Sequence, residues 1–197
     1  MNMPPMNCLI TGVGGQGTVL ISRLIGAAAL ARGCNVRGTE TIGMAQRGGS
    51  VVSHIRFGGG PIHSPLIPPG RADLVIAFES AEALRTLPFL APGGSMLVLN
   101  RGIVPAGAPE KSPSHDPARF IEELQKALAP SRLAIIDSED LIRRCGSARV
   151  VNIALLGFAA EKLLPFTLEE FLPVLRERLP ERHIQINERA LDIGAEL

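Results

Sequence analysis

The chain has 197 residues, 46% of them hydrophobic, which is enough for one sizeable core and favours one domain over residues 1–197. Its 20 basic and 19 acidic residues give a net charge of +1, and Trp and Tyr are absent, so we expect no nucleic-acid partner. No signal peptide or membrane-spanning apolar run is visible, so we expect a soluble cytoplasmic protein with no membrane partner.

The sequence contains three cysteines, Cys8, Cys34 and Cys145, which are far apart and form no C-x-x-C pair. An odd number of isolated cysteines, two of them in apolar surroundings, is typical of buried free thiols in a reducing compartment. Because iron–sulfur clusters are usually held by about four thiolates, we expect this chain by itself to hold no cluster.

Residues 7–17, which read NCLITGVGGQG, predict a strand, a tight glycine turn and the N-terminus of a helix. Glycines in such a turn can take positive φ and let a ligand approach the backbone. The free N–H groups of the first helical turn attract phosphate and other anions. The turn is therefore the predicted binding edge, and its candidate residues are Gly12, Gly14, Gly15, Gln16 and Gly17.

The G-x-G-x-x-G spacing of this turn allows three interpretations. A dinucleotide site also requires an acidic residue at the end of the second strand, about 20 residues further on. In that strand, predicted over residues 34–39, Arg37 lies near the end and Glu40 follows it. Arg37 would suit a 2′-phosphate instead. In the third interpretation the glycines only form a tight strand-to-helix turn.

The helix predicted over residues 16–32 is apolar around most of its circumference, and Gly33 is placed to end it. A helix of this kind must be covered on more than one side. In an α/β domain the sheet covers one side, and a neighbouring helix or a partner chain would cover the rest.

A polar, glycine-rich segment at residues 38–50 has neither helical nor strand periodicity, and a strand is predicted after it at residues 51–57. In a doubly wound sheet this segment would lie beside the first glycine turn. Arg47, with Gly48 and Gly49, offers a guanidinium next to accessible backbone amides, which suits phosphate or carboxylate. The alternative is a hairpin-like turn with a surface arginine.

The remaining chain alternates buried strands with helices, which predicts an α/β fold: a Rossmann-like, three-layer, doubly wound and mostly parallel sheet with helices on both faces. Strands are predicted at residues 72–78, 95–100 and 133–136, helices at 80–87, 117–128, 137–144, 149–164 and 183–197, a turn at 92–94, and loops at 58–70 and 101–115.

Several single residues carry further expectations. Ser80 follows a strand, where ligands bind in α/β folds, but it equally suits a helix N-cap. Asn152 is interpreted as a ligand or partner contact, or as an ordinary polar residue at a helix end. Asp116 is the predicted N-cap of the helix at residues 117–128.

Thr167 and Glu170 have capping-box spacing, and Phe166 and Phe171 are placed to form a hydrophobic staple around it. Pro173 predicts a kink or a shorter element.

No residues with the spacing of a known catalytic centre are evident. The four histidines are scattered, no G-x-S-x-G elbow occurs, and the Lys of a phosphate-binding Walker loop is missing after the glycines. Residue types and spacing thus lead only to a Rossmann-like domain with an anion site, and no catalytic residue is predicted.

The sequences GVGGQG at residues 12–17 and GTETIGMAQRGGSVVSHIRFG at residues 38–58 resemble the gamma-type domain of 2-oxoacid:ferredoxin oxidoreductases. Within that family the chain is most similar to the small beta subunits of indolepyruvate ferredoxin oxidoreductases. The similarity extends to RVVNIALLG at residues 149–157 and covers nearly the whole chain. The glycine turn alone is unspecific, whereas its combination with MAQRGGSVVSH is highly specific.

The resemblance implies a subunit of a complex that decarboxylates a 2-oxoacid on thiamine diphosphate, passes electrons through [4Fe-4S] clusters to ferredoxin, and transfers the acyl group to coenzyme A. It places the thiamine and the clusters in a large alpha subunit. This chain would then hold no cofactor tightly and would be inactive alone, with a homodimer contact as a further option. The glycine turn and Arg47 would receive coenzyme A phosphates or shape the interface.

Two other functions remain open from the sequence. The chain would be a stand-alone Rossmann-type NAD(P)-binding enzyme or sensor if Arg37 reads a 2′-phosphate. It would be a regulatory binding module if it kept the fold and lost the complex.

Overall fold

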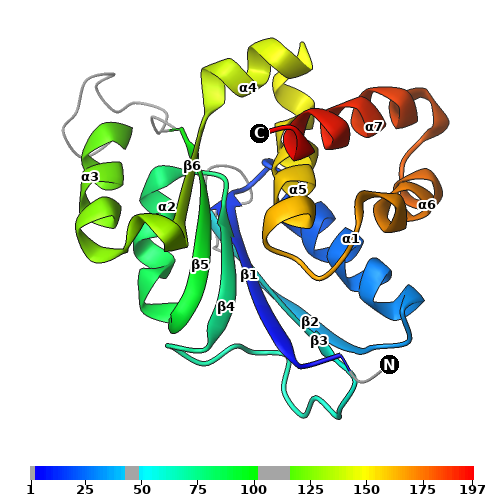
Figure 1. Ribbon diagram of the computed structural model, residues 1–197, viewed down its shortest axis with the longest axis horizontal. Coiled ribbons are helices and arrows are strands. Elements are labelled where there is room, and N and C mark those ends of the chain that lie inside the picture. The colour runs from blue at the N-terminus through cyan, green and yellow to red at the C-terminus, as the bar shows by residue number, and fades with distance from the viewer. Residues whose placement is uncertain (1–2, 43–48, 102–115) are drawn as a thin grey trace.

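The computed structural model describes residues 3–42, 49–101 and 116–197, and these form one six-stranded sheet with helices on both faces (Figure 1). The strand order is β2-β3-β1-β4-β5-β6. The strands are β1 (Met6–Val13), β2 (Asn35–Ile42), β3 (Ser50–Gly58), β4 (Ala72–Ala77), β5 (Leu90–Asn100) and β6 (Leu133–Asp137). The α-helices of the described residues are α1 (Thr18–Ala31), α2 (Ser80–Thr86), α3 (Pro117–Ala127), α4 (Ser138–Cys145), α5 (Val151–Lys162), α6 (Leu168–Arg178) and α7 (Glu181–Ala195). Short 3-10 turns are η1 (Leu87–Phe89), η3 (Pro130–Arg132) and η4 (Ala148–Val150).

The sheet is mixed but mostly parallel, which confirms the predicted α/β class. The pairs β1–β4, β4–β5 and β5–β6 are parallel. In contrast, β3 runs antiparallel to both of its neighbours, β1 and β2. The consecutive strands β2 and β3 therefore pair as a hairpin. A hairpin-like turn is one of the two alternatives for residues 38–50. Because β3 lies between β1 and β2, β2 occupies the sheet edge instead of the place beside β1.

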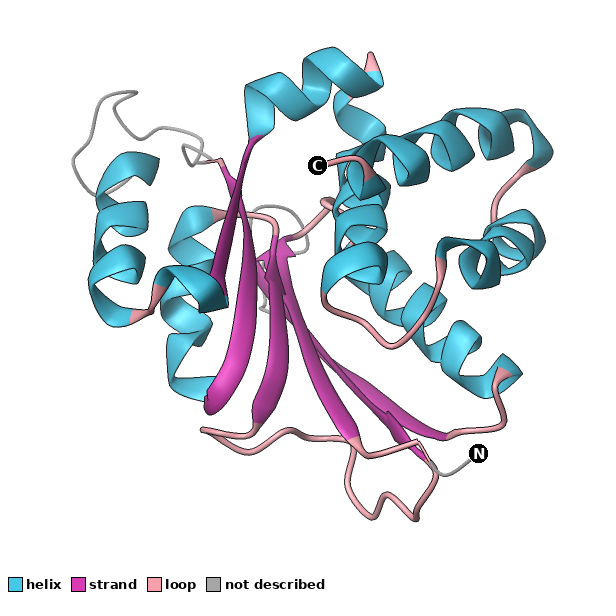
Figure 2. Cartoon of the chain, viewed as in Figure 1, coloured by secondary structure: helices cyan, strands magenta, loops and turns pink. Residues whose placement is uncertain are grey.

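Helix α1 packs over β3 and β2 and also contacts α5 and α6, so other parts of the chain cover it on more than one side. Its side chains Ile21, Leu24 and Ile25 are fully buried. Gly33 has a φ of +76° and ends the helix as predicted, while Leu30 near that end is 59% exposed. Figure 2 shows α1, α5, α6 and α7 on the same side of the sheet.

Helix α6 begins with the predicted capping box, in which the Thr167 N–H donates to Glu170 Oε2 at 2.8 Å. The rings of Phe166 and Phe171 pack edge to face with their centroids 5.9 Å apart, and they form the predicted hydrophobic staple. Arg32, just after α1, forms an ion pair with Glu170 and lies over the Phe166 ring. The hydrogen bond from the Arg32 guanidinium lowers the pKa of Glu170. The Arg32–Glu170 ion pair therefore connects the start of α6 to the end of α1.

The opposite face of the sheet is covered by α2 and α3, which pack on Leu9, Val75 and Met96 in a second core cluster. Asp116 caps α3 by accepting a hydrogen bond from the Ala118 N–H at 3.0 Å, as predicted. Ser80, however, is not an N-cap. Glu79 occupies that position, and the Ser80 Oγ instead lies 3.3 Å from Asn100 Oδ1.

One other expectation is wrong, and one of the two alternatives given for Pro173 is excluded. The predicted turn at residues 92–94 is part of β5, which carries a bulge opposite Ala72 and Leu74. Arg132 holds this bulge through bonds of 2.8 Å to the carbonyls of Gly94 and Ala91, a contact from a distant segment. In addition, Pro173 does not shorten α6, which continues to Arg178 and is anchored by buried Phe171 and Leu175.

The three cysteines are buried free thiols, as predicted. Burial raises the pKa of the Cys8 thiol, which keeps it protonated and unreactive. In the part of the chain that the structure describes, no helix has the length and apolar character needed to cross a membrane.

His54 on β3 provides a pH-dependent contact. Its Nδ1 accepts a hydrogen bond from the Ile67 N–H at 3.1 Å, and burial lowers its pKa below the usual 6.5. Because the folded state favours the neutral ring, this contact stabilises the protein fully above the unfolded-state pKa and is lost as pH falls through the folded-state pKa.

The substitution His54→Asn retains a hydrogen-bond acceptor that does not titrate. Urea unfolding between pH 7.5 and 5.0 should show a loss for the wild type that exceeds the variant's by about 1 kcal/mol; equal losses would contradict the assignment.

Helices α5 and α7 approach closely at two glycines. A Cβ atom at Gly157 would overlap the Leu191 carbonyl, and one at Gly194 would overlap the Ala154 carbonyl. Gly157→Ala and Gly194→Ala should therefore each lower the free energy of unfolding by about 1–3 kcal/mol, measured by urea unfolding. The control is Gly60→Ala, because a methyl group there would meet no atom within 4 Å. Equal effects at Gly60 and Gly194 would show that helix contact is not the cause.

Candidate functional site

A pocket of about 370 Å³ opens at the carboxyl ends of β1, β4 and β5, beside the start of α5. This is the edge at which ligands bind in open α/β sheets. The residues that line it come from the glycine turn, the two strand ends and the α5 N-terminus: Gly14, Gly15, Gln16, Gly17, Phe78, Leu99, Arg101, Ala148, Arg149, Val151 and Asn152.

The glycine turn has the positive φ angles that its sequence predicts. Gly15 and Gly17 have φ angles of +99° and +89°, which side-chain-bearing residues rarely adopt. At Gly12 a Cβ atom would lie 2.5 Å from Gln16 Oε1, so the turn folds tightly over the end of β1. The Gly14 N–H donates to the Gly49 carbonyl at 2.9 Å. The two glycine-rich segments therefore meet, as predicted.

Gln16 braces the turn with one end of its amide and leaves the other end unpaired. Its Oε1 accepts a hydrogen bond from the Val13 N–H at 2.6 Å. Its Nε2 is buried and has no hydrogen-bond partner among the described residues. A buried donor without an acceptor is costly. Gln16 also lines the pocket, so its unpaired amide group lies close to the space that a ligand would fill.

Asn152 brings the N-termini of α1 and α5 together. Its side chain is 7% exposed and lies directly against Gly17, where a Cβ atom would overlap its Nδ2. Its Oδ1 accepts a hydrogen bond from the Ile153 N–H at 2.9 Å, so it is a polar residue at a helix start, and it also lines the pocket. Two helix N-termini thus face one pocket, which favours an anion there.

Arg101 and Arg149 are the two arginines among the residues that line this pocket. Neither takes part in an ion pair within the described ranges. Guanidinium forks bind phosphate and carboxylate in a bidentate manner. These residue types make the pocket a candidate site for an anion with several oxygen atoms.

The structure brings together most of the predicted site residues. Gly14, Gly15, Gln16 and Gly17 line the pocket, and Gly12 and Gly49 support it from the ends of β1 and β3. Arg47 and Gly48 lie outside the described residues. Sequence reasoning missed four pocket residues, because the strand order and the position of α5 bring separate segments to one edge. These residues are Arg101, Arg149, Phe78 and Leu99.

The geometry does not favour a dinucleotide. Arg37 is exposed on edge strand β2 and lines another pocket together with His63, and β3 separates β2 from β1. Glu40 lies 4.0 Å from Arg23 of α1. Neither residue is among those that line the pocket at the glycine turn, so neither occupies the position of a ribose-binding side chain.

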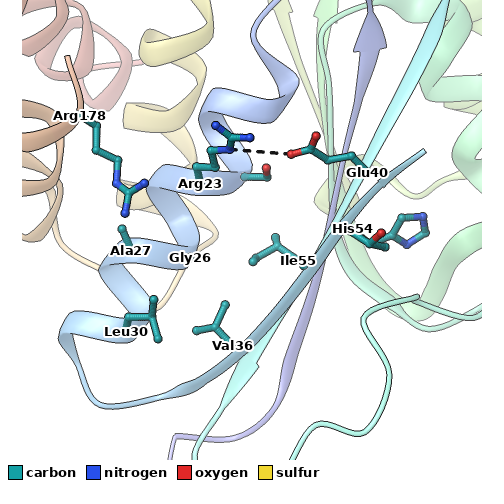
Figure 3. Close-up of a pocket in the computed structure, with 12 residues that line it drawn as sticks. Arg23, Gly26, Ala27, Leu30, Val36, Glu40, His54, Ile55 and Arg178 are labelled. Atoms are coloured by element: carbon teal, nitrogen blue, oxygen red, sulfur yellow. Dashed lines mark ion pairs between the residues drawn. The ribbon is translucent and has the colours of Figure 1, made fainter. Parts of the chain in front are cut away.

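A larger pocket of about 540 Å³ lies between α1 and strands β2 and β3 (Figure 3). Val36, Ile55 and Leu30 contribute apolar surface, and Arg23 and Arg178 contribute charge. The His54 ring points away from this pocket in Figure 3 and bonds to Ile67 on the other face. The pocket has no glycine turn or helix N-terminus, so it is the weaker candidate for an anion site.

Comparison with known proteins identifies the relatives of this chain. Indolepyruvate oxidoreductase subunit IorB of Archaeoglobus fulgidus is 36% identical and covers 96% of this chain and 93% of its own length. The same subunit of Methanothermobacter thermautotrophicus is 37% identical, with 95% of each chain covered. The 2-oxoglutarate:ferredoxin oxidoreductase of Magnetococcus marinus, solved with 2-oxoglutarate, coenzyme A and succinyl-CoA bound, shares the fold with a TM-score of 0.71 and 18% identity; the match covers 98% of this chain and 30% of that one. Over residues 7–197 the chain matches the family described as pyruvate ferredoxin/flavodoxin oxidoreductase, and it belongs to that family.

Proposed function

We propose that this chain is the small subunit of a 2-oxoacid:ferredoxin oxidoreductase complex that oxidises indolepyruvate or a related arylpyruvate to an acyl-CoA. The observation that carries the proposal is similarity of 32–37% identity, along nearly the whole chain, to subunits of indolepyruvate oxidoreductase. Electrons pass from the complex to ferredoxin. The chain acts in the cytoplasm, where its buried thiols stay reduced.

Thiamine diphosphate and [4Fe-4S] clusters belong to a larger alpha subunit in this proposal. The described residues of this chain contain no group of three or more His, Cys, Asp or Glu that is able to hold a metal ion. Its three cysteines are separately buried and do not fit a cluster. We therefore assign no step of the electron transfer to this chain, and a contact between two copies of it is a further option within the complex.

The pocket at the glycine turn fits the phosphates of coenzyme A, the acyl acceptor. The unpaired Gln16 Nε2, the guanidinium groups of Arg101 and Arg149, and two helix N-termini all favour phosphate oxygens. Gly14, Gly15 and Gly17 let a phosphate approach the backbone. Gly12, Arg47, Gly48 and Gly49 complete the proposed site. Coenzyme A is bound in a solved 2-oxoglutarate:ferredoxin oxidoreductase that shares this fold, which supports coenzyme A as the ligand. The role of these residues is to bind and orient the acyl acceptor.

The subunit assignment predicts what accompanies the chain in cells. Affinity purification under anaerobic conditions should yield a larger brown protein that carries thiamine diphosphate. The complex should reduce ferredoxin with an arylpyruvate and coenzyme A. A colourless chain without a partner, purified under conditions that preserve such complexes, would contradict the proposal. Micromolar NAD(P)H binding to that chain would then support the nucleotide-binding alternative.

The site assignment predicts a selective loss in Arg149→Ala. Removing one guanidinium should raise the KM for coenzyme A about tenfold, equivalent to about 1.4 kcal/mol, and should leave the KM for the 2-oxoacid unchanged. The matched control is Arg143→Ala on α4, because Arg143 donates to Asp140 at 3.0 Å and does not line the pocket. Steady-state kinetics of the complex measures both. Equal KM values in the two variants would reject the coenzyme A site.

A further inference from the structure

The carboxylate of Glu82 is buried near the strand end that carries the glycine turn, and it does not line the pocket. Glu82, in the first turn of α2, is 4% exposed and is not among the pocket-lining residues. Its Oε2 accepts a hydrogen bond from Ser50 Oγ at 2.6 Å and lies 3.5 Å from Thr11 Oγ1. Its Oε1 lies 3.5 Å from Nη2 of the exposed Arg85. One carboxylate thus joins α2, β3 and β1.

Ser50 is a critical position for the shape of the site. It is the first residue of β3 and pairs with Val13, the last residue of β1. The residue before it, Gly49, supplies the carbonyl that accepts the Gly14 N–H at 2.9 Å. The Val13 N–H is in turn held by Gln16 Oε1. A displacement of Ser50 would therefore move the acceptor that fixes Gly14.

We infer that Glu82 is a positioning residue: through Ser50 and Gly49 it holds the glycine turn in the conformation that binds the phosphates of coenzyme A. The inference rests on the proposed function of the pocket. Glu82 lies on the α2 side of the sheet, whereas the pocket opens on the α5 side, so its charge does not contact the ligand.

The chemistry of this contact explains why an acceptor is needed at position 82. A buried carboxylate loses hydration, and hydrogen bonds from hydroxyl groups offset that cost. An apolar side chain there would leave the half-buried Ser50 Oγ without this acceptor. A glutamine would retain a carbonyl oxygen for Ser50. The effect therefore depends on the acceptor and less on the charge.

The test compares Glu82→Ala, Ser50→Ala and Glu82→Gln in the purified complex. Glu82→Ala and Ser50→Ala should raise the KM for coenzyme A about three- to tenfold, as expected for one lost hydrogen bond, and leave kcat within about twofold. Glu82→Gln should keep the KM near the wild-type value. Amide hydrogen exchange of the peptide that contains Gly14 should accelerate in the two alanine variants only.

The control is Thr86→Val, because Thr86 is buried in the same helix and its hydroxyl donates to carbonyls of that helix, at Glu82 and Ala83. It should change neither the KM nor the exchange at Gly14. Unchanged exchange in Glu82→Ala, or equal damage from Glu82→Gln, would overturn the inference. If exchange accelerates while the KM for coenzyme A stays constant, the inference also fails, and Arg149→Ala then shows whether the pocket itself binds coenzyme A.

Discussion

The hydrogen bond from the Gly14 N–H to the Gly49 carbonyl is the contact on which the site depends. The antiparallel register of β1 and β3 places Val13 opposite Ser50, so the chain leaving β1 must meet the chain entering β3. Two glycine-rich segments far apart in the sequence thereby share one corner of the sheet. The positive φ angles of Gly15 and Gly17 then turn the chain into α1, whose N-terminus lies beside that of α5.

The inserted strand β3 explains why the glycine turn has no ribose-binding acid. In a dinucleotide fold the second strand lies beside the first, so its last residues reach the ligand. Here the start of β3 takes that place, and β2 moves to the sheet edge with Arg37 exposed on it. The missing acid is therefore a consequence of the topology. The glycine turn instead lines a pocket whose other residues come from the ends of β4 and β5 and the start of α5.

Features set by neighbouring residues could be predicted from the sequence. The strand, turn and helix at residues 7–17, the Asp116 cap and the Thr167–Glu170 capping box all depend on contacts within a few positions. Features set by distant contacts could not. Residues 92–94 read as a turn but join β5, because Arg132 binds two of its carbonyls. Arg101 has no local pattern that marks it as a pocket residue, and the RVVNIALLG segment that begins at Arg149 indicates the family but not a pocket. The strand order and the position of α5 bring the two arginines to the glycine turn.

The charges at this end of the sheet are divided between its two faces. On the α2 side, the Glu82 carboxylate is buried and bonded to Ser50. On the α5 side, Arg101 and Arg149 line the pocket, and Gln16 Nε2 is buried and, among the described residues, has no acceptor. The carboxylate can thus stabilise the strand end without repelling an anion, because the sheet separates it from the pocket. In the proposed site, the donors lie on one face of the sheet and the carboxylate that supports the strand end lies on the other. A phosphate in the pocket would then pair with donors that no carboxylate of this chain has neutralised.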